Sequence, residues 1–197
     1  MMPRALRNLL DLGYYHIFTR GNDRKQIFRC NDDYNHIFNI IKEALDMFQI
    51  NILHYCLMPN HLHLLIQAII AKELPKFMQR ILQVYAAYFK KKYDSVGFVF
   101  QNRYKSLHIN KESYLLECAR YIEKNPLRAK IVTSLFEYPW SSFLCYAKGK
   151  ENDLIRVSNP IYLELSENQE ERQRKFCEFI LEERAYDSII DDFFRIS

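Results

Sequence analysis

Apolar and polar positions recur with two different periods in the first part of the chain. Residues 14–20 are aromatic and β-branched and end at a Gly-Asn-Asp sequence, which predicts a strand followed by a turn. From Asn31 to Phe48, apolar residues recur at helical spacing behind an Asn-Asp-Asp sequence that can cap a helix. Residues 50–58 and 61–68 predict two strands, which a tight turn at Pro59-Asn60 joins into a hairpin.

The second part of the chain continues this alternation of elements. Residues 72–92 predict a long amphipathic helix with apolar residues on one face. Residues 96–108 predict a fourth strand, which a break near Asn102-Arg103 could divide. Residues 111–124 predict a further helix that ends at Asn125-Pro126, because a residue before proline disfavours the helical conformation.

The order of these elements predicts an α+β fold of the ferredoxin-like type. Two β-α-β halves joined by a hairpin form a four-stranded antiparallel sheet with helices packed on one face. Beyond Trp140, a charged helical tail is expected from about Glu167 to Phe194. We therefore expect one domain of residues 1–146, followed by an acidic helical C-terminal extension of residues 147–197.

Charge is divided unevenly along the 197 residues, although the net charge is only +4. Residues 1–150 contain 22 Lys and Arg against 12 Asp and Glu, a net charge of +10. Residues 151–197 contain 6 against 12, a net charge of −6. The basic part favours a polyanionic partner, and the acidic tail needs an explanation of its own.

Nothing in the composition predicts a secreted or membrane-spanning protein. The five cysteines are widely separated and include no CxxC pair, so neither a disulfide framework nor a zinc knuckle is expected. Asp11 interrupts the N-terminal apolar run, which argues against a signal peptide. The apolar stretch of residues 64–71 is too short to span a bilayer. A reducing cytoplasm is the expected compartment.

A pair of histidines is the first candidate for chemistry. His61 and His63 lie two positions apart on a predicted strand, so both imidazoles face the same side and Leu62 and Leu64 face the other. Such a pair can hold a divalent metal ion on a rigid sheet. It can equally be two polar residues on a half-exposed sheet face. His16 and His54 are expected to be satisfied sheet residues rather than ligands.

A tyrosine and an asparagine on the last predicted helix are the second candidate. Tyr121 and Asn125 are four positions apart and therefore share a helix face. If that face lies over the histidine strand, a phenol and an amide oxygen lie beside two imidazoles, which suits phosphoryl transfer to tyrosine. Alternatively, Tyr121 only packs, as most of the 14 tyrosines must, and Asn125 caps a short helix over residues 126–129.

Several motifs occur together in one order: Tyr15-His16-Ile17 with Arg20-Gly21-Asn22, then Cys56 to Leu65, Gly97 to Ser106, Arg120 to Ala129 and Tyr138 to Ser142. In this set, over roughly residues 14–146, the chain resembles the REP-associated tyrosine transposases. These are single-tyrosine members of the HUH nucleases and are related to small insertion-sequence transposases.

The resemblance implies a role for each matching residue. It implies that His61 and His63 hold a divalent cation, Mg²⁺ or Mn²⁺, and that Asn125 is a third, amide-type ligand. It also implies that Tyr121 is the nucleophile, which forms a 5′-phosphotyrosine link and frees a 3′-OH. The implied partner is single-stranded DNA with a hairpin, acted on by a monomer or homodimer without an organic cofactor or a membrane partner. The protein would be cytoplasmic, and associated with the nucleoid when bound to DNA.

Basic residues interleaved with aromatic ones support DNA binding independently. Lysine and arginine neutralise phosphates, and aromatic rings stack on unpaired bases at roughly 1–3 kcal/mol each. A solvated basic face is the alternative for any single residue. The candidate DNA-binding residues are Arg20, Asn22, Arg24, Lys90, Lys91, Lys92, Arg103, Lys105 and Arg128.

Two rival functions stay open. In one, the protein is a non-catalytic single-strand nucleic-acid-binding protein on an RRM-like sheet; in the other, it is a metal-dependent nuclease that uses water as the nucleophile. The acidic tail has two interpretations as well. It could lie across the basic DNA groove and compete with DNA, or it could be a helix that completes the core.

Overall fold

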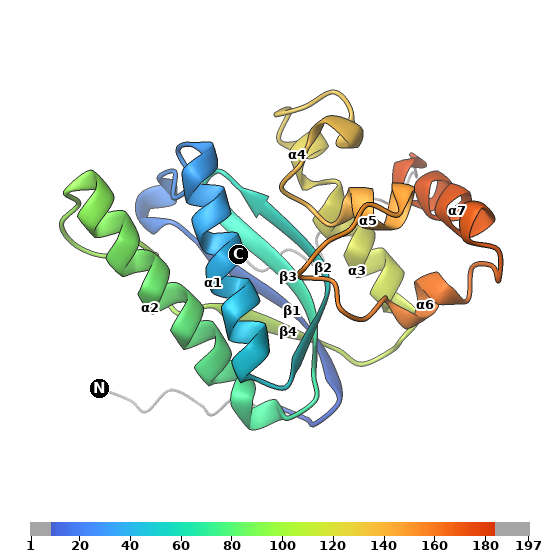
Figure 1. Ribbon diagram of the computed structural model, residues 1–197, viewed down its shortest axis with the longest axis horizontal. Coiled ribbons are helices and arrows are strands. Elements are labelled where there is room, and N and C mark those ends of the chain that lie inside the picture. The colour runs from blue at the N-terminus through green and yellow to red at the C-terminus, as the bar shows by residue number, and fades with distance from the viewer. Residues whose placement is uncertain (1–8, 184–197) are drawn as a thin grey trace.

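Four strands form the central sheet in the order β2-β3-β1-β4, and each neighbouring pair is antiparallel (Figure 1). The computed structural model describes residues 9–183. Its main elements up to the last core helix are β1 (Gly13–Arg20), α1 (Asn31–Met47), β2 (Ile50–Met58), β3 (His61–Ala68), α2 (Leu74–Tyr93), β4 (Lys105–Ile109) and α3 (Tyr114–Glu123). This β-α-β-β-α-β order and the strand order confirm the predicted α+β, ferredoxin-like fold.

Shorter elements and the C-terminal helices complete the described part of the chain. They are α4 (Asn125–Arg128), α5 (Phe143–Lys148), α6 (Pro160–Leu163) and α7 (Gln169–Leu181), with 3₁₀ turns η1 (Asn22–Arg24), η2 (Ala71–Glu73) and η3 (Leu135–Glu137).

Helices cover both faces of the sheet. Helices α1 and α2 lie side by side across one face, where Ile17, Leu64 and Ile66 are fully buried beneath them (Figure 1). Helix α3 packs on the opposite face, against Leu53 and Leu65. The two helices of the β-α-β halves therefore lie on one face, as predicted, and α3 covers the other. Strand β2 is buried along nearly its whole length, so both of its faces carry apolar side chains that need cover.

Strand β4 is much shorter than predicted. The sequence predicts a strand over residues 96–108, whereas the observed strand is Lys105–Ile109, with only an isolated bridge between Gly21 and Phe100 before it. Gly97 has a φ of 88°, which interrupts an extended conformation. Val96 and Phe98, on either side of it, are both exposed, so neither packs on the sheet. The segment before β4 is therefore a projecting loop.

The C-terminal helices build a third apolar cluster next to α3. Phe176 and Ile180 of α7 are fully buried there with Phe143 and Tyr146 of α5. This packing confirms, for α7, the alternative in which the tail completes the core. The predicted tail helix ends at Leu181, and positions 184–194 of that prediction lie outside the described residues. The division into units at residue 146 stays a prediction. None of the described helices has the length and hydropathy to cross a membrane.

A buried polar network fastens α3 to the sheet and to the C-terminal region. His54 on β2 donates from Nδ1 to Oε1 of Glu123 at 3.1 Å, and the Ser142 hydroxyl donates to the same oxygen at 2.5 Å. The Asn159 amide donates to Nε2 of His54 at 3.2 Å. All four side chains are buried. The expectation that His54 is a satisfied sheet residue is confirmed, and the end of α3 is held from three directions.

Candidate active site

The two histidines of β3 face the same side of the sheet, beneath α3. Their rings lie 5.0 Å apart between centroids and are perpendicular. In the antiparallel register, Arg20 of β1 is opposite His61, and Phe18 is opposite His63. Leu62, between the two histidines, points into the apolar core under α1 and α2. The predicted alternation of this strand is confirmed.

Hydrogen bonds fix the orientation of both imidazoles. Nδ1 of His61 is 2.5 Å from Oδ1 of Asn60, and Nδ1 of His63 is 2.9 Å from Nε2 of His16. Because each ring uses its Nδ1 atom in this way, Nε2 is the nitrogen that can meet a cation. A metal-ligating histidine is commonly oriented by a hydrogen bond from its other nitrogen. His16 is a satisfied sheet residue, as expected, but its partner is a candidate ligand, which the sequence did not predict.

Burial keeps the histidine side chains neutral. Burial and the nearby Arg20 guanidinium lower the pKa of His61 to about 4, and a hydrogen bond with Asn125 opposes this shift. Burial lowers the pKa of His16 to about 3. Burial, with the neighbouring His61, His16 and Arg128, holds the pKa of His63 well below its usual value. Neutral imidazoles retain the lone pair that a metal ligand needs.

Tyr121 of α3 lies against this histidine cluster. Its ring centroid is 5.6 Å from that of His63 and 5.6 Å from that of His16, in edge-on arrangements. Arg128 of α4 places its guanidinium 5.3 Å from the centre of the Tyr121 ring and donates to the Tyr121 carbonyl at 2.7 Å. The guanidinium therefore lies in cation–π distance of the ring. The helix face predicted from the spacing of Tyr121 and Asn125 does lie over the histidine strand.

Asn125 joins the same group through its side chain. Its Nδ2 donates to the carbonyl oxygens of Tyr121 at 2.8 Å and Ile122 at 3.2 Å. The side-chain carbonyl oxygen is therefore the atom turned toward His61. The alternative in which Asn125 caps the following helix is wrong, because α4 begins without a side-chain cap and the amide instead binds the end of α3.

The donor set fits a divalent cation. Two imidazole nitrogens and one amide oxygen suit Mn²⁺ and, less strongly, Mg²⁺, and such a set leaves coordination positions for phosphate oxygens. Among residues 9–183 there is no group of three or more His, Cys, Asp or Glu side chains arranged to hold a metal ion. A third ligand at this site would therefore be the Asn125 oxygen.

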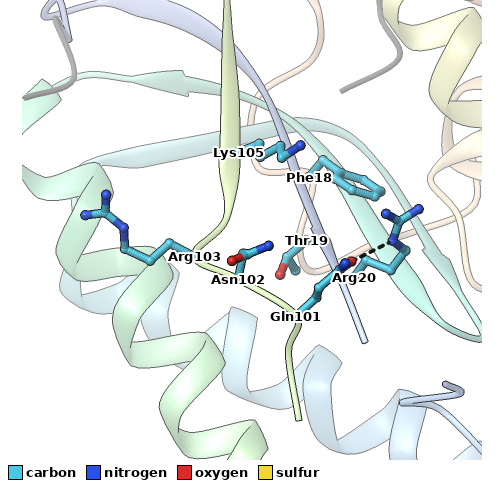
Figure 2. Close-up of a pocket in the computed structure, with 7 residues that line it drawn as sticks. All are labelled: Phe18, Thr19, Arg20, Gln101, Asn102, Arg103 and Lys105. Atoms are coloured by element: carbon cyan, nitrogen blue, oxygen red, sulfur yellow. Dashed lines mark hydrogen bonds between the residues drawn. The ribbon is translucent and has the colours of Figure 1, made fainter. Parts of the chain in front are cut away.

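The predicted DNA-binding residues fall into separate groups. Arg20, Arg103 and Lys105 line one cavity beside the histidines (Figure 2). Lys90 and Arg103 line a wider groove between α2 and the projecting loop, next to Phe98, whose side chain is 85% exposed. Lys90 and Arg103 therefore lie in one groove with an exposed aromatic ring, as single-strand binding requires.

The remaining candidates lie elsewhere or have internal partners. The Lys92 ammonium donates to Asp33 at 2.8 Å, to Tyr88 at 2.9 Å and to Cys30 at 3.1 Å, so it belongs to a local cluster. Asn22 borders a small cavity at the loop, and Arg128 lies at the Tyr121 ring. The remaining two are exposed, Arg24 in η1 and Lys91 in the last turn of α2.

The α+β sheet places two histidines beneath the helix that carries Tyr121. The family model for IS200-like transposases matches residues 10–125. The chain belongs to this family, and it is therefore a transposase-like, DNA-binding protein of a class that cleaves and rejoins DNA.

A solved structure has the same fold. A REP-associated tyrosine transposase bound to a REP hairpin superposes with a TM-score of 0.63 at 17% sequence identity, covering 78% of this chain and 90% of that one. At this identity the likeness establishes the fold. A candidate transposase from Deinococcus radiodurans R1 is 16% identical, covers 66% of this chain and 92% of its own, and has a TM-score of 0.42. No curated protein sequence matches the chain.

Proposed function

We propose that this protein cleaves and rejoins single-stranded DNA next to a hairpin, through a covalent bond to Tyr121. The observation that carries the proposal is the contact of the Tyr121 ring with His63, one of the two histidines on β3, beside the Arg128 guanidinium. A phenol, two neutral imidazoles, an amide oxygen and a fixed cation then surround one position where a phosphate can bind. The hairpin partner is proposed because a protein of the same fold is bound to one.

His61, His63 and Asn125 are the residues that would hold Mg²⁺ or Mn²⁺ in this site. When bound, the cation polarises the scissile phosphodiester and stabilises its added negative charge. His16 and Asn60 keep the two imidazoles in the orientation that presents Nε2.

Tyr121 supplies the nucleophile for an in-line displacement. Its phenolic oxygen forms the new bond to phosphorus, and the bond from phosphorus to the 3′ oxygen breaks. The phenol loses one proton and the leaving 3′ oxygen gains one, so the step is balanced without water. The hydrogen bond from Arg128 to the Tyr121 carbonyl holds the backbone of the nucleophile. The 5′-phosphotyrosine link conserves the energy of the broken bond, so the reverse step can join a strand without ATP.

One gel experiment tests this proposal against both rival functions. Labelled single-stranded hairpin DNA is incubated with the protein and Mg²⁺ or Mn²⁺, and the products are separated under denaturing conditions. We expect a covalent protein–DNA adduct that a chelator prevents. Cleavage without an adduct would instead support a water-using nuclease. Binding that is unchanged by chelator, with no cleavage of varied hairpins, would support the non-catalytic binder.

A further inference from the structure

An opening in the sheet lies directly beside the histidine site. Strand β1 pairs with β4 as far as Phe18 and Lys105, and the next contact is the bridge between Gly21 and Phe100. Two residues of β1 therefore face four residues, 101–104, of the other segment, which is a larger irregularity than a simple β-bulge. The excess length bows outward and leaves a cavity of about 100 Å³.

The cavity carries positive charge and no opposing carboxylate. Three cationic side chains line it, and the other polar groups are two amides and a hydroxyl: Arg20, Arg103 and Lys105, with Gln101, Asn102 and Thr19. Figure 2 shows Gln101, Asn102 and Thr19 at the centre, with the Arg103 side chain directed away from them. Arg20 is held at the rim by a 3.3 Å hydrogen bond from its Nε to Gln101. Small size, positive charge and donor groups suit a phosphate better than a base.

Thr19 provides a second, independent sign of a ligand. Its side chain is only 3% exposed, and its hydroxyl has no hydrogen-bond partner within residues 9–183. A buried hydroxyl without a partner is costly and calls for an explanation. A ligand oxygen in the cavity would accept the missing hydrogen bond.

The position of the cavity indicates which ligand this is. Arg20 is the cross-strand neighbour of His61, and Phe18 is that of His63, so through these two residues the cavity adjoins the candidate metal site along β1. Thr19, opposite Leu62, reaches the cavity from the other face of the sheet. We infer that it binds a non-scissile backbone phosphate of the same DNA strand, close to the phosphate that Tyr121 attacks. This inference rests on the proposed function and adds to it. Holding a neighbouring phosphate in a rigid sheet sets which linkage reaches Tyr121, so the cavity determines the register of cleavage.

Neutral backbone linkages test the inference. Full-length protein with Tyr121→Phe, which binds without forming an adduct, is titrated with hairpin oligonucleotides that each carry one methylphosphonate linkage. We expect one linkage near the cleavage point to weaken binding strongly. Thr19→Val and Lys105→Gln should each raise Kd about tenfold, because each loses a hydrogen bond to a charged group. In both variants the methylphosphonate at that linkage should raise Kd little further, because the variant has already lost the contact with that phosphate. This is the non-additivity that a double-mutant cycle measures for interacting groups.

Lys76→Gln is the matched control. Lys76 is exposed in the first turn of α2, which follows the end of β3 remote from His61, and the variant removes the same charge as Lys105→Gln. It should leave Kd and the methylphosphonate profile unchanged. Thr19→Val removes an unsatisfied hydroxyl at nearly constant volume, so its Tm should not fall.

The outcomes separate the two proposals. If Tyr121-dependent adducts form but the methylphosphonate profiles of Thr19→Val and Lys105→Gln match that of the parent, the cavity is not a phosphate site and the proposed function stands. If the protein binds no hairpin at all, both proposals are wrong.

Discussion

The two faces of the sheet are built from the same strands but by opposite rules. Under α1 and α2 the contacts are apolar, as with Ile17 and Leu64, and this is the larger core cluster. Under α3 the same strands add histidines to a smaller apolar cluster, and His16 is hydrogen-bonded to His63. Burial of apolar surface is the main source of folding stability, whereas buried polar groups must be paired to avoid a cost.

The difference shows how one sheet separates stability from chemistry. Adjacent residues of a strand point to opposite faces. Leu62 and Ile17 therefore lie under α1 and α2, whereas their neighbours His63 and Phe18 lie on the α3 side. The α1/α2 face can therefore supply rigidity without carrying the histidines or Tyr121. The α3 face can hold a cluster that is costly to bury, because the other side stabilises the scaffold.

The largest expected effect comes from the nucleophile on the α3 face. Tyr121→Phe keeps the ring that packs on His63 and removes only the hydroxyl. Adduct formation should fall by at least about 10³-fold, as on removing other nucleophiles, with an unchanged Tm. A denaturing gel and thermal unfolding measure the two effects. Tyr114→Phe, at the start of the same helix, is the control and should keep full adduct yield. Adducts that persist in Tyr121→Phe would mean that another residue attacks.

A matched pair of leucines tests the separation of the two faces. Leu64 points to the α1/α2 face and Leu65 to the α3 face, and both are fully buried. Leu64→Ala and Leu65→Ala should each cost about 2–5 kcal/mol of unfolding free energy, measured by denaturant titration. Adduct yield per folded molecule should be retained in Leu64→Ala and reduced in Leu65→Ala, because only Leu65 supports α3. Equal yields would show that the faces are not separable.

A smaller effect is expected when the support of His63 is removed. His16→Leu loses the hydrogen bond to Nδ1 of His63, so Mn²⁺ affinity should fall by about 10- to 100-fold, as for other residues that orient a metal ligand. Calorimetric titration with Mn²⁺ measures this without any DNA. His16→Gln supplies an amide acceptor and should recover part of the affinity. A loss of Tm with unchanged Mn²⁺ affinity would assign His16 a packing role only.

The smallest effect is expected at Asn125. An amide oxygen is a weaker ligand than an imidazole, so Asn125→Ala should lower Mn²⁺ affinity by less than about tenfold. The same variant loses the hydrogen bonds to Tyr121 and Ile122, which favours a small drop in Tm. Asn39→Ala, on the exposed side of α1, is the control and should change neither value. Unchanged Mn²⁺ affinity in Asn125→Ala would exclude it as a ligand.

Local patterns in the sequence predict much of the fold. Alternation around His61 and the spacing of Tyr121 and Asn125 depend only on neighbours along the chain, so strand faces and helix faces follow from them. The length of β4 does not follow from local patterns. It depends on the positive φ of Gly97 and the exposed position of Phe98, which are set by contacts with the rest of the fold. The placement of α3 on the second face could have been anticipated from the nearly continuous apolar run of β2.

Parts of the candidate site depend on strand register, which one sequence does not reveal. His16 belongs to the site only because β1 lies beside β3, and Thr19 lines a cavity only because β1 and the segment before β4 differ in length between two contacts. The available signal on β1 was that His16 and Arg20 lie four positions apart and so share one strand face, with Phe18 between them.

The buried link from Glu123 through His54 to Asn159 has a practical consequence for fragments of this protein. The family match ends at residue 125, so the region beyond it could be taken for a dispensable appendage. A fragment cut at residue 146 would contain every proposed ligand and the nucleophile. It would nevertheless lack the amide that satisfies His54 and the α7 side chains that cover Phe143. If such a fragment were inactive, the cause could be the loss of these contacts that hold α3. Its inactivity would therefore not be evidence against Tyr121 as the nucleophile.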